Sequence, residues 1–128
     1  MKTAVAFALC LVAGGAAAQS PSPDWTLLPG DMPLSVDDLG SLTNGGSLTF
    51  HDDGISRFSA GGSYSYTYAN QGGTAFGTFD IRDDGKICID FRNGAGCCDL
   101  YVRNGLRLIL LTENGERFPV KIELGINP

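Results

Sequence analysis

The chain has 128 residues, a formal net charge of −5 and a hydrophobic content of 43%. This length suits one domain with a modest core. The acidic balance argues against binding to nucleic acid and to anionic membranes, because both require a basic patch.

Residues 1–18 have the pattern of a secretory signal peptide. Lys2 supplies a positive charge, an apolar run extends from Ala4 to Ala13, and an Ala-x-Ala cleavage motif ends at Ala18. The apolar run is too short to cross a bilayer as a helix. We therefore expect cleavage between Ala18 and Gln19, a periplasmic or secreted mature protein, and no membrane insertion of the mature form.

Residues 19–34 form a proline-rich arm, which contains four of the six prolines of the chain. Proline fixes φ and removes a hydrogen-bond donor, so this composition predicts an extended arm. The apolar residues Trp25, Leu27 and Leu28 indicate that the arm packs against the domain. Residues 35–128 are then expected to form a single domain.

A short helix is predicted over residues 35–43. Ser35 can cap its N-terminus, and Asp37 and Asp38 lie in the first turn, where the helix dipole favours negative charge. An Asn-Gly-Gly sequence ends the helix. The apolar residues at helical spacing are Val36, Leu39 and Leu42.

After the helix, the hydrophobic period changes to two, which predicts β-strands. The Asp-Asp-Gly sequences at 52–54 and 83–85 are typical of hairpin turns. The last strand is expected to place Phe118, Val120, Ile122 and Leu124 on one face. The expected strands cover residues 47–51, 55–59, 63–69, 76–82, 86–91, 97–103, 106–112 and 118–124.

This spacing predicts an all-β fold with one short N-terminal helix. About eight short strands without crossover helices favour an antiparallel up-and-down meander. Eight strands can close into a small closed or partly closed barrel, whose interior holds side chains or one small ligand. Tyr64, Tyr66 and Tyr68 alternate along one strand and form a candidate ligand face, although a buried barrel wall is the simpler interpretation.

Three cysteines follow the predicted cleavage site, and Cys10 precedes it. In an oxidising compartment they predict one structural disulfide from Cys88 and one odd thiol. A regular turn between the two strands would pair Cys88 with Cys97, whereas a bulge at the glycines would pair it with Cys98. We expect neither a metal site nor a redox role, because the usual ligand spacing and a Cys-x-x-Cys motif are both lacking.

The sequence contains no recognisable catalytic group of residues. Asp83 and Asp84 are expected to form turns, and the single histidine, His51, to be a solvated residue at a strand end. We therefore predict no catalytic residues, no cofactor and no enzymatic activity. The aspartates near the central hairpins are Asp80, Asp83, Asp84, Asp90 and Asp99.

A resemblance covers about residues 35–124. The chain contains Gly77-Thr-Phe-x-Ile81, then Asp84-Gly85-x-x-Cys88, and a further cysteine immediately before Asp99. It resembles a set of small exported alphaproteobacterial proteins of undescribed function, with a Gly-x-Trp/Phe-x-Val/Ile…Asp-Gly-x-x-Cys hairpin in a calycin-like barrel. The resemblance implies a Cys88–Cys98 pair, although the Cys97-Cys98 doublet departs from its pattern. It supplies no catalytic residues.

Three hypotheses for function follow. The first is a non-enzymatic exported barrel that binds a small ligand or a periplasmic protein at its open end. The second is a protein inhibitor of an exported cell-wall hydrolase, because a negative surface attracts cationic lysozymes. The third is a hydrolase that uses the aspartate cluster, and it is the least favoured.

Overall fold

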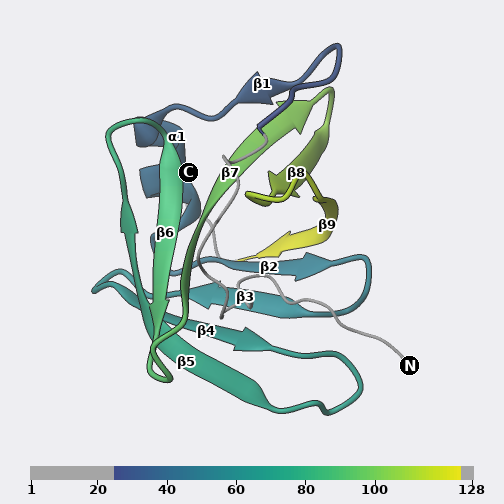
Figure 1. Ribbon diagram of the computed structural model, residues 1–128. Helices are drawn as coiled ribbons and strands as arrows, with labels where there is room; N and C mark the ends of the chain where they lie inside the picture. Colours follow the sequence, from purple (N-terminus) through teal and green to yellow (C-terminus); the bar gives the residue numbers. More distant parts are fainter. Residues whose placement is uncertain (1–24, 125–128) are drawn as a thin grey trace.

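The computed structural model describes residues 25–124 as a closed eight-stranded antiparallel β-barrel with one short helix (Figure 1). The predicted signal peptide lies outside the described residues. The elements are β1 (Met32–Pro33), α1 (Val36–Leu42), β2 (Ser47–Phe50), β3 (Ile55–Phe58), β4 (Ser63–Thr67), β5 (Thr74–Ile81), β6 (Lys86–Phe91), β7 (Gly96–Asn104), β8 (Arg107–Leu111) and β9 (Arg117–Leu124).

The strands follow the predicted meander. From β2 to β9 each strand pairs antiparallel with the next, and β9 returns to pair with β2, which closes the barrel. Strand β1, a two-residue strand in the arm that was not predicted, pairs with Val102 and Arg103 of β7. Among residues 25–124, we find no helix that is long and apolar enough to cross a membrane.

The two Asp-Asp-Gly sequences form turns, as predicted. In the first, Asp53 has a φ of 75°, and the Asp52 carboxylate accepts a hydrogen bond of 2.9 Å from the Gly54 amide. The Tyr66 hydroxyl occupies the place where a side chain at position 54 would begin, so any larger residue there would displace Tyr66. In the second turn, Gly85 has a φ of 87°, a conformation that glycine adopts without strain.

The barrel interior is filled by side chains. Aromatic rings occupy much of it, and Phe58 packs against both Tyr64 and Phe79 at centroid distances of 5.2 and 5.0 Å. Helix α1 contributes Leu39 and Leu42 to the same cluster, which fixes the helix against the barrel. The buried members are Leu34, Leu39, Leu42, Leu48, Phe50, Phe58, Tyr64, Tyr66, Ile87, Ile89, Tyr101, Leu108 and Leu110.

The arm packs against the outside of the barrel through Trp25, as expected, but Leu27 and Leu28 are 42% and 49% exposed, so their expected docking was wrong. Trp25 covers a second buried cluster on β7 and β8, and the Lys86 ammonium lies 5.1 Å from the centre of its ring. The Asp31 side chain is fully buried and binds Arg117. The residues of this outer cluster are Leu100, Val102, Ile109 and Leu111.

The last strand departs from the predicted alternation. The β2–β9 register shifts between Thr49 and Phe50, so the strand carries a bulge after Val120. Phe118 and Val120 pack against the core, but Ile122 and Leu124 are 43% and 57% exposed. The expectation that all four residues share one face was therefore wrong, because the bulge changes the phase of the strand.

Candidate binding site at the open end of the barrel

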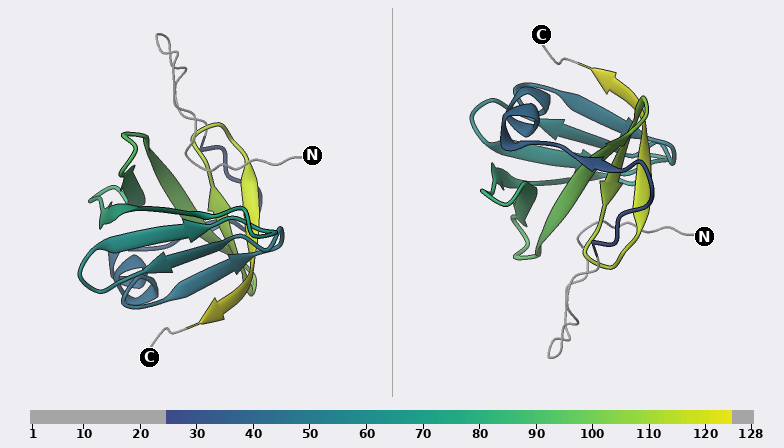
Figure 2. Two further views of the ribbon diagram at one scale, coloured as in Figure 1. Left: turned by 90° about the horizontal axis from the view of Figure 1, so that it is seen from below. Right: turned by 90° about the horizontal axis from the view of Figure 1, so that it is seen from above.

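The strand β9 bends where its bulge occurs, and this bend opens one end of the barrel. Strand β8 pairs with β9 only from Arg117 to Pro119, whereas the rest of β9 pairs with β2. Figure 2 shows that the second half of β9, in yellow, runs in a different direction from its first half. We call the resulting gap, bounded by β1, α1, the end of β7 and the second half of β9, the open end.

Arg103 and Glu123 form an ion pair across the open end. The guanidinium of Arg103 donates two hydrogen bonds to the Glu123 carboxylate, at 2.9 and 3.0 Å. Glu123 lies opposite the buried Leu48, and Arg103 lies two positions after the buried Tyr101, so both side chains are on the interior face. The hydrogen bonds from Arg103 to Glu123 raise the pKa of the guanidinium.

A cleft of about 450 Å³ lies at this end. Leu34 and Leu42 supply buried apolar surface, while Asp38 and Ser41 of α1 add exposed polar groups beside the ion pair. This combination of apolar surface and few polar groups is typical of small-ligand sites. The lining residues are Met32, Pro33, Leu34, Asp38, Ser41, Leu42, Arg103 and Glu123.

The tyrosine stripe faces the barrel interior. Tyr64 and Tyr66 are each 4% exposed, and the Tyr64 hydroxyl hydrogen-bonds the buried Ser56 hydroxyl at 2.8 Å. Burial raises the pKa of both phenols. Tyr68 is partly buried and lies edge-on to Tyr66, with their ring centres 4.9 Å apart. The three residues are not among those that line the cleft at the open end.

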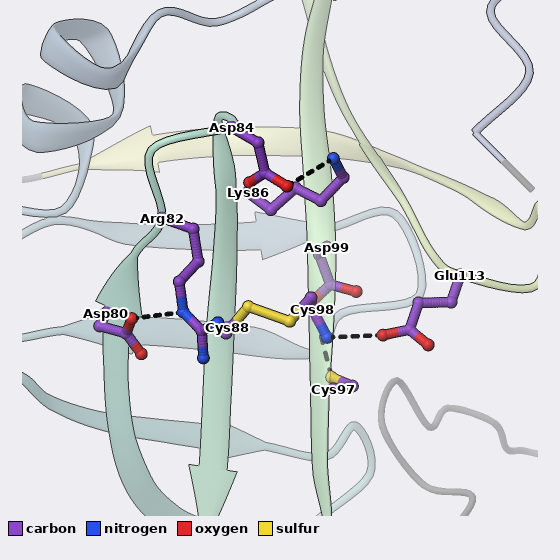
Figure 3. The surroundings of a disulfide bond; sticks show 9 residues. All are labelled: Asp80, Arg82, Asp84, Lys86, Cys88, Cys97, Cys98, Asp99 and Glu113. Atoms are coloured by element: carbon purple, nitrogen blue, oxygen red, sulfur yellow. Dashed lines mark hydrogen bonds and ion pairs between the residues drawn. A yellow bond between two sulfur atoms is a disulfide. The ribbon is translucent and has the colours of Figure 1, made fainter. Parts of the chain in front are cut away.

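A disulfide joins Cys88 on β6 to Cys98 on β7 (Figure 3). These residues are direct cross-strand partners, because the turn between Phe91 and Ala95 contains three residues instead of two, with Gly94 at a φ of 95°. The pairing that the resemblance implied is therefore found, and the Cys97 pairing expected from strict alternation is wrong. The structure describes no free cysteine, so the odd thiol predicted from the sequence is not found either.

The central aspartates do not form a catalytic pair. Asp80 binds Arg82 at 2.6 Å and Asp84 binds Lys86 at 3.3 Å, both at the surface, while Asp99 is 1% exposed (Figure 3). Burial, followed by the nearby Glu113 charge, raises the pKa of Asp99 well above its usual range. Hydrolysis by paired carboxylates needs two groups around one accessible site, and this arrangement does not supply it.

The remaining sequence candidates do not gather into a site. Asp90 is exposed on β6, Asp83 lies in the β5–β6 turn, and His51 is exposed in the β2–β3 turn, with its amide donating to Pro119. Within residues 25–124, no group of three or more histidine, cysteine or acidic residues is arranged to hold a metal ion.

Sequence reasoning proposed an open end but could not locate its residues, because its position depends on one bulge in β9. The available signal was Pro119, since a proline within a strand marks an edge or an irregularity. It stands next to the residue where the register shifts. Counting apolar residues at a period of two did not reveal the bulge. The sequence of residues 118–124 keeps its alternation, whereas the backbone does not.

The fold and the cleft define a small closed antiparallel β-barrel with a ligand-sized opening at one end. No family model, curated protein or solved structure matches the chain. The cleft and the chemistry of its lining are therefore the basis for a functional proposal.

Proposed function

We propose that this chain is an exported, non-enzymatic β-barrel protein that binds a ligand or partner at its open end. The observation that carries the proposal is the cleft of about 450 Å³, which combines apolar surface from Leu34 and Leu42 with the Arg103–Glu123 ion pair. The volume lies within the range of small-ligand sites. The pattern of residues 1–18 supports the exported location, and a cross-strand disulfide is consistent with an oxidising compartment.

The rigid surroundings of the cleft favour binding. The closed sheet and the packed α1 hold the lining in place, which reduces the ordering cost of binding. Ser35 caps α1 by accepting a hydrogen bond of 3.0 Å from the Asp38 amide. Asp38 and Ser41 are therefore presented to the cleft from a fixed helix.

Fragment screening by nuclear magnetic resonance tests this proposal. We would titrate ¹⁵N-labelled protein, residues 19–128, with a library of small amphipathic compounds and map the shifted amides. The expected result is a cluster of shifts at Leu34, Leu42, Arg103 and Glu123. The variant Ser41→Trp, which places an indole at the cleft, should remove these shifts. Shifts that spread over the barrel, or that survive in Ser41→Trp, would contradict the proposal.

A matched control uses Ser63→Trp. Ser63 is exposed on β4 and is not part of the cleft lining. This variant adds the same side chain at a distant surface position, so it should retain the fragment shifts of the wild type. Thermal unfolding of both variants, followed by circular dichroism, would show that they remain folded.

Inhibition of an exported cell-wall hydrolase is the second candidate function. It is favoured by the β7–β8 hairpin tip, where Leu106 is 96% exposed. The Asn104 side chain fixes this tip against the arm by donating hydrogen bonds to the Pro29 carbonyl at 3.0 Å and to the Asp31 carboxylate at 2.9 Å. A rigid loop with an exposed apolar side chain can insert into the cleft of a partner.

A lysozyme assay tests this second function. Peptidoglycan hydrolysis by a cationic lysozyme would be measured with increasing amounts of the barrel protein. The expected result is stoichiometric inhibition that Leu106→Asp weakens at least about tenfold. Ser63→Trp provides a control at a position away from the tip. Absence of inhibition at micromolar protein would exclude lysozyme as the target.

A further inference from the structure

The second half of β9 has a free backbone edge. In β2, the amide of Phe50 donates to Gly54, and the amide of Phe58 in β3 donates to Gly46, so the even-numbered residues of β2 point their backbone groups toward β3. The odd-numbered residues of β2 must then face β9, as the bond from the His51 amide to the Pro119 carbonyl shows.

This alternation identifies the exposed backbone groups of β9. Thr49 is the partner of Ile122, and Ser47 is the partner of Leu124, so Ile122 and Leu124 use their backbone groups toward β2. The amide and carbonyl of Glu123 consequently point away from β2. Within residues 25–124, β8 pairs with β9 only as far as Pro119, so no described strand pairs with this edge at Glu123.

The free edge lies at the rim of the cleft. Glu123 lines the cleft with its side chain while its backbone is open to pairing. A strand added here would place the side chain opposite Glu123 on the cleft side, toward Leu34 and Leu42. Its neighbouring side chains would lie on the outer face, beside the exposed Ile122 and Leu124.

The charges around the cleft specify the occupant further. Among the residues that line it, Arg103 is paired with Glu123, so the carboxylate of Asp38 remains as excess negative charge. The complete chain is also acidic, with a net charge of −5. A basic side chain close to the apolar anchor would complement this charge.

We infer that the open end binds an extended peptide segment of another protein by adding it as a strand to the free edge of β9. An apolar side chain of the segment fills the cleft, and a basic side chain two positions away meets Asp38. Main-chain hydrogen bonds then supply affinity, while the cleft supplies specificity. This inference rests on the proposed function, since it names the class of ligand for the same cleft.

Selection from a random twelve-residue peptide library displayed on phage provides the probe. The target is residues 19–128 with its disulfide intact, and enriched peptides are made synthetically for calorimetry. We expect sequences with an apolar residue and a Lys or Arg at a spacing of two. Methylation of the peptide nitrogens that would pair with β9 should weaken binding at least about tenfold.

Two variants of Glu123 separate backbone pairing from side-chain contact. Glu123→Pro removes the free amide of residue 123 and leaves the hydrogen bonds between β9 and β2 in place, and proline is tolerated at a strand edge. This variant should weaken binding of the selected peptide at least about tenfold. Glu123→Gln keeps the amide and removes the charge, so its loss should be clearly smaller. In the wild type, bound peptide should slow hydrogen exchange of the Glu123 amide.

The outcomes distinguish this inference from the proposed function. If selected peptides bind the cleft but tolerate nitrogen methylation and Glu123→Pro, strand addition is wrong and the binding cleft stands. If neither peptides nor fragments bind at the open end, both proposals fail. If the Glu123 amide is already protected in a dimer seen by sedimentation, a second copy occupies the edge, and the peptide proposal is overturned.

Discussion

Asp31 and Arg117 form a two-point ion pair although they lie 86 positions apart, with hydrogen bonds of 2.8 and 3.0 Å. The Asp31 carboxylate also accepts hydrogen bonds from the Leu28 amide at 2.7 Å and from Asn104 at 2.9 Å. The side chain of Asp31 is fully buried, so this one carboxylate ties the arm to β7 and β9.

Substitution of Asp31 should therefore release the arm and destabilise the fold. Asp31→Asn keeps the shape but removes the charge that Arg117 binds, and hydrogen bonds to charged groups contribute about 1.5–3 kcal/mol. We expect a loss of about 2 kcal/mol in urea unfolding. Trp25 is the only tryptophan of the chain, so its fluorescence reports arm release. An unchanged midpoint with unchanged fluorescence would show that the ion pair is dispensable.

The same carboxylate gives a signature at low pH. Hydrogen bonding from Arg117 holds the pKa of Asp31 below its usual range. The stabilisation is therefore complete above the unfolded pKa of about 3.9 and is lost as pH falls toward the lower folded value. Wild-type stability should fall more steeply than that of Asp31→Asn below about pH 4. Parallel curves for the two proteins would argue against this contribution.

The disulfide should contribute to stability by an amount set mainly by the short loop that it closes. Cys88 and Cys98 are separated by 10 positions, and closure of a loop of this size contributes about 2–3 kcal/mol. The double variant Cys88→Ala/Cys98→Ala should lose about this amount in urea unfolding. Cys97→Ser should keep the Cys88–Cys98 peptide in a non-reducing map. A dominant Cys88–Cys97 peptide in the wild type would contradict the structure.

The hydrogen bond between Ser56 and Tyr64 should also be measurable. Both hydroxyls are buried, so Tyr64→Phe leaves the Ser56 hydroxyl without its partner and should cost about 1–2 kcal/mol. The double variant Ser56→Ala/Tyr64→Phe should recover part of this loss, because it leaves no unsatisfied group. A double-mutant cycle measures the coupling, and strictly additive effects would argue against the hydrogen bond.

Local signals were sufficient for most of the fold. The bounds of β6 match the predicted segment, because apolar residues and the turn at Gly85 define both its position and its phase. The phases of β7 and β9 were not predictable in the same way. One positive-φ glycine, Gly94, and one bulge near Phe50 shift the register by a single residue, and period-two counting cannot locate such a shift.

The candidate site depended on these unpredictable features. The cleft exists because β9 leaves β8 after Pro119, and the ion pair that spans it joins residues from opposite sides of the gap, Arg103 and Glu123. No local pattern in the sequence places these two residues together. The tyrosine stripe was visible in the sequence, but the burial of Tyr64 and Tyr66 depends on the closure of the entire barrel.

Asp99 should make the stability of the protein depend on pH in the opposite direction to Asp31. Its side chain lies on the interior face of β7, two positions before Tyr101, and is 1% exposed. Its Oδ1 has no hydrogen-bond partner among the described residues. Nearby, Glu113 accepts a hydrogen bond of 3.0 Å from the Cys98 amide. Burial and the Glu113 charge raise the pKa of Asp99, so the folded protein holds this proton at a pH where the unfolded chain has lost it.

The contribution of Asp99 to the free energy of unfolding should therefore be complete below its unfolded pKa of about 3.9. This contribution should be lost as pH rises toward the folded pKa of Asp99. The slope can reach about 1.4 kcal/mol per pH unit for one proton. Asp99→Asn has no proton to lose and should abolish this slope in urea unfolding between pH 5 and pH 8, a range above the acid window of Asp31. Glu113→Gln keeps an acceptor for the Cys98 amide but removes the charge, so it should reduce the slope without abolishing it. If wild type and Asp99→Asn showed the same pH dependence, the Asp99 carboxyl would have to be ionised in the folded protein. The barrel around Asp99 would then have to admit water.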